Sequence, residues 1–67
     1  MQVEVNGLKQ EMPPNSNVLQ LLQQFEIAAE GIAVEINLTV IDRQAYDATV
    51  LQDGDTVEII RFIGGGK

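Results

Sequence analysis

The chain contains a single pattern with helical spacing, and this pattern lies at Val18-Leu19-Gln20-Leu21-Leu22-Gln23-Gln24-Phe25. Apolar residues within it recur at positions i, i+3, i+4 and i+7, and glutamines occupy most of the other side. This spacing predicts one short amphipathic helix. Asn17 lies three residues before Gln20 and is placed to cap the first turn through a capping box. We expect the helix to fray over residues 28–30 and to stop at Gly31, which tolerates the left-handed conformation of a helix end.

Alternating apolar and polar residues on both sides of this helix predict β-strands. Before the helix, residues 2–12 alternate around Asn6-Gly7, a pair that supplies the two positive φ angles of a type I′ turn. After the helix, residues 32–36 alternate and residues 38–41 form a short apolar run. Residues 56–62 are β-branched and aromatic enough for a last strand. The sequence therefore predicts an opening hairpin, the helix and three further strands.

These elements require a mixed sheet of about five strands with one main helix lying across one face, which is an α+β fold. Because the helix separates the first hairpin from the rest of the chain, the last strand most simply enters the sheet beside the first strand. The helix and strand periods together define the expected core. Its members are Val3, Val5, Leu8, Leu21, Leu22, Phe25, Val34, Val57 and Ile59.

The composition excludes several kinds of functional site and several classes of partner. A length of 67 residues allows one domain, and the absence of cysteine and histidine removes disulfides, thiolate or imidazole metal sites and the common nucleophile–base pairs. Most familiar catalytic chemistry is thereby excluded. A net charge of −6, from ten acidic and four basic residues, has the wrong sign for nucleic acid or an anionic membrane. The expected class is a cytoplasmic protein whose partners have basic surfaces.

The last predicted strand carries an exposed apolar pair. If Val57 and Ile59 face the helix, the period of two puts Ile60 and Phe62 on the opposite face, which a single helix leaves open to water. Neighbouring apolar side chains on such a face predict a docking patch for a protein partner. The alternative is a bulge or twist that turns Phe62 back over the edge of the core.

A run of glycines follows this strand. We expect residues 1–63 to form the domain and residues 64–67 to form a flexible glycine tail. Gly64 and Gly65 lack a Cβ atom, so they can thread a narrow channel and bring a terminal carboxyl group to another protein's active site. Taken alone, such a run is more typical of a linker or a disordered end.

Several segments of the chain, taken together with their order and spacing, resemble a known protein family. They are the hairpin at Asn6-Gly7, the helix at residues 18–22, Ile32-Ala33-Val34-Glu35-Ile36-Asn37, Ile41-Asp42-Arg43-Gln44-Ala45-Tyr46, Leu51-Gln52-Asp53-Gly54-Asp55-Thr56-Val57-Glu58-Ile59, and the glycine tail. Together they resemble the ubiquitin-like sulfur carrier proteins, most closely the carriers of thiamine biosynthesis, the ThiS family. The resemblance covers nearly the whole chain. Asp42 and Tyr46 stand where the family often has Pro and Trp, which we expect to alter packing and leave the chemistry unchanged.

The resemblance implies a ubiquitin-like β-grasp fold and a protein cosubstrate that is not itself an enzyme. Such a carrier is expected to have no catalytic residue of its own and to bind no metal and no cofactor. In this family an adenylating, E1-like enzyme uses ATP to activate the carboxylate of the terminal glycine. A cysteine desulfurase or sulfurtransferase route then supplies the sulfur that makes a thiocarboxylate, and thiazole synthase accepts it. By this resemblance Gly66 is the expected site of adenylation and thiocarboxylation, and Gly64 and Gly65 thread the tail. Ile60 and Phe62 are the expected partner-binding residues.

Lys67 follows the glycines and is the main departure from the family pattern. Because an amide at Gly66 cannot be adenylated, we expect a peptidase to remove Lys67, or the lysine to be foreign to the natural protein. Three other functions stay open at this point. They are a molybdopterin-synthase-type sulfur carrier, a ubiquitin-like modifier of other proteins, and an interaction module that needs no reactive terminus.

Overall fold

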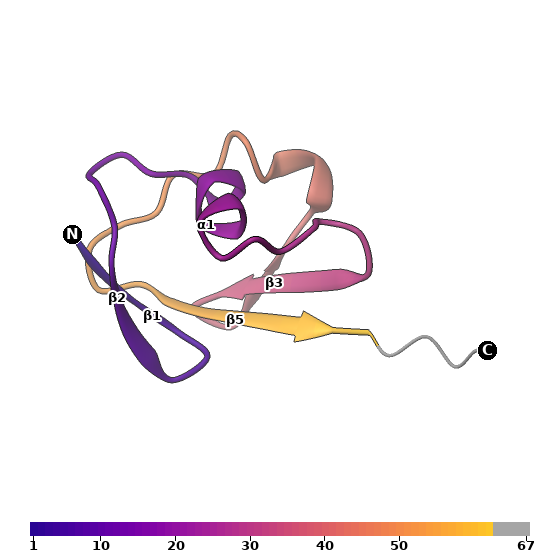
Figure 1. Cartoon of the computed structure of the whole chain (residues 1–67), viewed down its shortest axis with the longest axis horizontal. Helices are drawn as coiled ribbons and strands as arrows, with labels where there is room; N and C mark the ends of the chain where they lie inside the picture. The colour runs from indigo at the N-terminus through magenta and orange to yellow at the C-terminus, as the bar shows by residue number, and fades with distance from the viewer. Residues whose placement is uncertain (63–67) are drawn as a thin grey trace.

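The computed structural model of the chain describes residues 1–62, which form five strands and one α-helix (Figure 1). In chain order the elements are β1 (Gln2–Val5), β2 (Leu8–Glu11), α1 (Val18–Gln24), β3 (Ile32–Ile36), β4 (Thr39–Ile41), a 3-10 helix (Arg43–Ala45) and β5 (Thr56–Arg61). The strands make one mixed sheet in the order β2-β1-β5-β3-β4. As predicted, β5 enters beside β1, parallel to it, and pairs antiparallel with β3 on its other side. With α1 across one face, this is the ubiquitin-like β-grasp fold (Figure 1).

The opening hairpin confirms the turn predicted from the sequence. Asn6 and Gly7 have φ angles of 49° and 85°, the positive values that a type I′ turn requires at both central residues. This turn fixes the antiparallel register in which Val5 pairs with Leu8 and Gln2 pairs with Glu11.

Helix α1 begins as predicted, with the capping box at Asn17. The Gln20 amide donates to the Asn17 Oδ1 atom at 2.8 Å, and the Asn17 amide donates to the Gln20 Oε1 atom at 2.8 Å. Each side chain thus satisfies a backbone N–H that has no partner within the helix.

The predicted end of the helix is wrong, because α1 ends at Gln24 and does not continue toward Gly31. The Ile27 amide donates to the Leu22 carbonyl at 2.9 Å and the Glu26 amide donates to the Gln23 carbonyl at 3.1 Å. This pair of bonds is a Schellman motif, and Glu26 occupies its left-handed position with φ 58°. Because a glutamate is an uncommon residue at this position, the helix end could not be predicted from the residue type.

The core lies between α1 and the sheet. Its buried members are Val3, Val5, Met12, Val18, Leu21, Leu22, Val34, Tyr46, Leu51 and Val57. Three expected members differ, since Phe25 and Ile59 are only half-buried and Leu8 is 67% exposed. Leu8 shares a face with its partner Val5, but it sits on edge strand β2 beside the turn, beyond the cover of the seven-residue helix. The predicted burial of Leu8 is therefore wrong.

The connection between β4 and β5 completes the core. It supplies the buried side chains of Tyr46 and Leu51 and is tied to the start of the helix by backbone hydrogen bonds. The Val18 amide donates to the Thr49 carbonyl at 3.0 Å, and the Leu51 amide donates to the Ser16 carbonyl at 2.8 Å. This segment closes the end of the core that the sheet leaves open.

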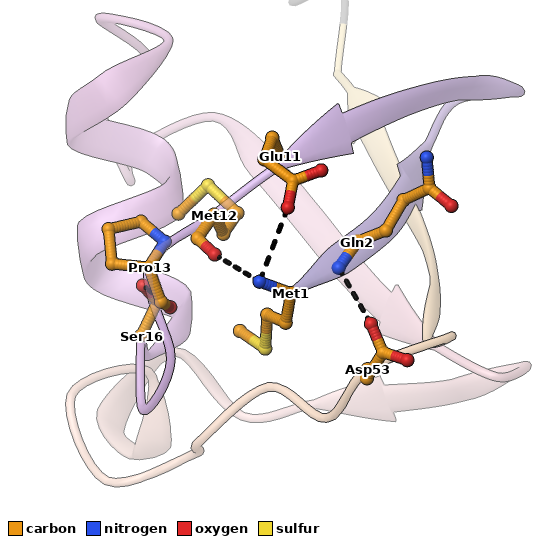
Figure 2. Close-up of polar contacts among 7 residues, drawn as sticks. All are labelled: Met1, Gln2, Glu11, Met12, Pro13, Ser16 and Asp53. Atoms are coloured by element: carbon orange, nitrogen blue, oxygen red, sulfur yellow. Dashed lines mark hydrogen bonds and ion pairs between the residues drawn. The ribbon is translucent and has the colours of Figure 1, made fainter.

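Residues at the start of β1 are held by polar contacts to two distant segments (Figure 2). The Met1 amino group donates to the Met12 carbonyl at 2.7 Å and lies 3.5 Å from a carboxylate oxygen of Glu11. The Gln2 amide donates to the Asp53 Oδ1 atom at 2.7 Å. The turn before β5 is thereby joined to β1.

The structure does not test the predicted boundary between the domain and its tail. The predicted division into a domain of residues 1–63 and a tail of residues 64–67 falls largely on residues 63–67, which lie outside the described residues. Among the helices of residues 1–62, none combines the length and apolarity needed to cross a bilayer.

Candidate functional site

The structure describes the strand that leads to the glycine tail, whereas the predicted reactive and threading residues Gly64, Gly65, Gly66 and Lys67 lie outside residues 1–62. β5 is the central strand of the sheet and ends at Arg61. The Phe62 amide then donates to the Gly31 carbonyl at 2.8 Å, so the pairing with the β3 side continues one residue further. The chain therefore leaves the domain from the middle of the sheet.

The predicted docking residues lie at this exit. Ile60 is 42% exposed and Phe62 is 61% exposed, as expected for the face of β5 that α1 does not cover. Ile60 pairs with Ala33 of β3, a small residue that leaves the Ile60 side chain open to solvent. Phe62 also borders a shallow hollow of about 300 Å³ shared with Ile27 and Arg61. Their role as partner-binding residues stays a prediction.

The face of the sheet opposite α1, called here the outer face, is acidic beside this apolar pair. Glu58 of β5 lies directly opposite Glu35 of β3, and Val40 pairs with Glu35 from β4. Glu4 adjoins Thr56 on the same face and lies opposite Lys9 of β2. Like charges directly across a ladder destabilise a sheet slightly. The outer face is thus suited to a partner that brings positive charge to it.

Asn6 has a role that the sequence did not reveal. Its side chain pairs with the backbone of β5, since the Ile59 amide donates to the Asn6 Oδ1 atom at 2.7 Å and the Asn6 Nδ2 atom donates to the Ile59 carbonyl at 3.2 Å. The amide group therefore replaces one residue of a neighbouring strand where β1 ends. The Asn-Gly motif indicated a turn, but no sequence signal indicated this second contact.

Asp53, Asp55 and Arg43 make structural contacts. Asp53 accepts the hydrogen bond from Gln2 described above, and Asp55 accepts from the Gln52 amide at 2.8 Å through its Oδ2 atom. Arg43 lies 3.5 Å from Glu30, with both side chains exposed. In the described part of the chain, His, Cys, Asp and Glu residues form no group of three that could hold a metal ion.

The chain is similar to known proteins over nearly its whole length. Residues 2–66 match the model of the ThiS family. The crystal structure of a thiamine biosynthesis protein (ThiS) from Geobacter metallireducens is 42% identical and superimposes with a TM-score of 0.85, covering 98% of this chain and 100% of that one. The sulfur carrier protein ThiS of Escherichia coli strain K12 is 29% identical over 98% of this chain and 100% of its own length.

A second group of relatives is much longer. The thiazole synthase of Magnetococcus marinus is 37% identical over the entire chain. The chain spans only 21% of that protein's length.

Proposed function

Since the chain belongs to the ThiS family, we propose that it is a sulfur carrier of thiamine biosynthesis, which carries sulfur as a thiocarboxylate on Gly66 and donates it to thiazole synthase. The observation that carries the proposal is the family match, which spans residues 2–66 and so includes the glycine run. The match stops at Gly66, and this supports Gly66 as the reactive residue, with Lys67 either removed by a peptidase or foreign to the natural protein.

The proposed chemistry takes place on partner enzymes. A carboxylate is a poor electrophile, so an adenylating enzyme first joins the Gly66 carboxylate to AMP from ATP and releases pyrophosphate. The acyl-adenylate carries a good leaving group, and a persulfide from a cysteine desulfurase or sulfurtransferase route displaces AMP to give an acyl disulfide. A thiol then attacks the donor's sulfur, forms a disulfide with the donor and releases the acyl group with the terminal sulfur. The product is a thiocarboxylate, a soft nucleophile. These steps require a compartment that holds ATP, in agreement with the cytoplasmic location expected from the sequence.

The chain's own contribution is recognition and delivery. β5 pairs with β1 at Thr56 and Val57 and with β3 as far as Arg61, so the tail starts from a strand held in the sheet. A start held in this way lowers the conformational freedom that must be lost when the tail enters an active site. We propose that Ile60 and Phe62, exposed at that point, contact the partner while Gly64 and Gly65 thread the channel.

The longer relatives support thiazole synthase as the acceptor. A segment like this chain occurs within proteins named thiazole synthase. Joining a carrier to its acceptor in one polypeptide raises their effective concentration without a new contact. That arrangement is useful only if the two parts react with each other, and it favours thiazole synthase over the molybdopterin acceptor.

Intact-mass measurement tests the proposal directly. The full chain, the chain ending at Gly66 and the chain ending at Gly65 are each incubated with the adenylating enzyme, ATP and a sulfur donor. The chain ending at Gly66 should exchange one oxygen for sulfur, and the full chain should do so only after a peptidase is added. The chain ending at Gly65 should fail, because its carboxylate lies about 3.5 Å short of the nucleotide.

Other outcomes point to the alternatives. Covalent attachment to lysines of other proteins would identify a modifier, and no mass change under any condition would leave an interaction module. Thiocarboxylation of the full chain with Lys67 intact, at the rate of the shortened chain, would show that Gly66 is not the reactive residue.

A further inference from the structure

The backbone of β5 alternates in the direction of its hydrogen bonds. Toward β3, the Asn37 amide donates to the Thr56 carbonyl and the Phe62 amide donates to the Gly31 carbonyl, both at 2.8 Å. In an antiparallel ladder, hydrogen-bonded pairs alternate with pairs that are not hydrogen-bonded. Arg61 pairs with Ile32 in this register and falls between the bonded positions. The Arg61 N–H and C=O groups therefore point away from β3.

The same alternation directs the Arg61 N–H and C=O groups to the flank of β5 along which β1 pairs with the earlier residues Thr56 and Val57. On that flank the Asp55 and Val57 carbonyls accept from the amides of Glu4 and Asn6, each at 2.9 Å. The Asn6 side chain then satisfies both backbone groups of Ile59. Arg61 is the next residue along β5 whose backbone N–H and C=O groups point to this flank.

In the part of the chain that the structure describes, no strand continues along the flank to meet Arg61. β1 ends at Val5, which lies opposite Val57, and the chain reverses direction at Asn6-Gly7 while β5 runs on to Arg61 (Figure 1). Within residues 1–62, no hydrogen bond from another segment reaches the Arg61 backbone on this side. Arg61 is also exposed. One amide donor and one carbonyl acceptor thus face solvent beside the exit of the tail.

We propose that this open flank of β5 at Arg61 pairs with an extended segment of the adenylating enzyme, which adds to the sheet in line with β1 beyond Asn6. An extended backbone supplies a donor and an acceptor at the spacing that Arg61 presents, and strand addition at a sheet edge is an established mode of peptide binding. The proposal rests on the proposed function, because it takes the partner to be the enzyme that receives the tail.

The surroundings of the flank restrict the partner segment. Its residues on the outer face would lie beside Ile60 and Phe62, so we expect apolar side chains at those positions. The Glu35–Glu58 pair further along the outer face favours a basic residue nearby. The open edge is also very short, because Asn6 closes it at Ile59. A short edge limits pairing between copies of the chain.

Amide hydrogen exchange tests the pairing on the unmodified chain. In the free protein the Arg61 amide should exchange rapidly, whereas the Ile59 amide, bonded to Asn6, should already be protected. Addition of the adenylating enzyme and ATP should slow Arg61 exchange by at least about tenfold. A complex that forms while Arg61 exchanges as fast as before would overturn the proposal.

A matched pair of variants tests the backbone apart from the side chain. R61P removes the N–H group on the open flank, a position where proline does not break the ladder with β3. R61A removes the side chain and keeps the N–H group. R61P should weaken binding of the enzyme about tenfold, and R61A should stay within about twofold of the unmodified chain. Equal losses in both variants, or no loss in R61P, would contradict backbone pairing.

These measurements separate the inference from the proposed function. If the Arg61 amide of a chain that ends at Gly66 is protected from exchange but no thiocarboxylate forms, the pairing is supported and the proposed sulfur chemistry is wrong. Full thiocarboxylation while the Arg61 amide exchanges as fast as in the free protein would support the sulfur chemistry and rule out the pairing. If R61P did not fold, the exchange measurement on the unmodified chain would still give the answer.

Discussion

The turn between β3 and β4 holds a leucine in a conformation that leucine rarely adopts. Asn37 and Leu38 have φ angles of 51° and 71°, and the Leu38 side chain is 88% exposed. A residue with a Cβ atom loses about 1–2 kcal/mol in the left-handed region. Glycine avoids that strain but loses about 0.5–1 kcal/mol more conformational freedom on folding. Because so little apolar surface is buried at Leu38, L38G should stabilise the fold by about 0.5–1 kcal/mol.

Asn37 provides the matched control in the same turn. Its Nδ2 atom donates to the Asp55 Oδ1 atom at 3.0 Å, and its Oδ1 atom accepts from the Thr56 amide at 3.0 Å. N37G also tolerates the positive φ angle but loses both bonds, so it should destabilise the fold by about 1–2 kcal/mol. One glycine substitution should therefore raise stability and its neighbour should lower it.

Urea unfolding and thermal melting measure both changes. A change of 1 kcal/mol shifts the melting temperature of a domain of this size by about 4–8 °C. L38G should melt higher than the unmodified chain, with the same dependence of unfolding free energy on urea. A lower melting temperature for L38G would show that the Leu38 side chain stabilises the fold through a contact and that strain does not dominate.

Three further results are expected. N17A should cost about 1 kcal/mol in urea unfolding, because the capping box loses the acceptor for the Gln20 amide; an unchanged midpoint would contradict the capping geometry. L21A should cost about 2–5 kcal/mol, since Leu21 is fully buried, and a loss below 1 kcal/mol by the same measurement would mean that the core repacks around it. I60A and F62A should each weaken binding of the adenylating enzyme by about 1–3 kcal/mol in calorimetry with the melting temperature nearly unchanged, and wild-type affinity in both would remove them from the interface.

Local patterns predicted the parts of this fold that depend on nearby residues. The Asn6-Gly7 turn, the capping box at Asn17 and the alternation in β5 each involve residues a few positions apart, and all were predicted correctly. Ile60 was likewise expected on the outer face, and it is exposed there. The position of the helix in the chain predicted that the last strand enters beside the first, as it does. The family resemblance added the family, which agrees with the comparisons.

Errors arose where distant segments determine the outcome. Leu8 follows the strand period, but its burial depends on how far α1 extends over β2, and the helix is too short to reach it. Tyr46 and Leu51 were missed as core residues because they lie in a connection without a regular period. The Asn6 contact with Ile59 joins positions far apart in the chain, and no local rule predicts it.

The central place of β5 also bears on how the chain folds. Without β5 the sheet consists of two separate hairpins, β1–β2 and β3–β4, because every pairing between them passes through it. Isolated two-stranded hairpins are at best marginally stable in water. The contact between Glu4 and Thr56 therefore closes a long loop before much of the sheet can become stable. Such non-local contacts slow folding, so a ribosome-bound chain must expose β5 before its sheet can assemble.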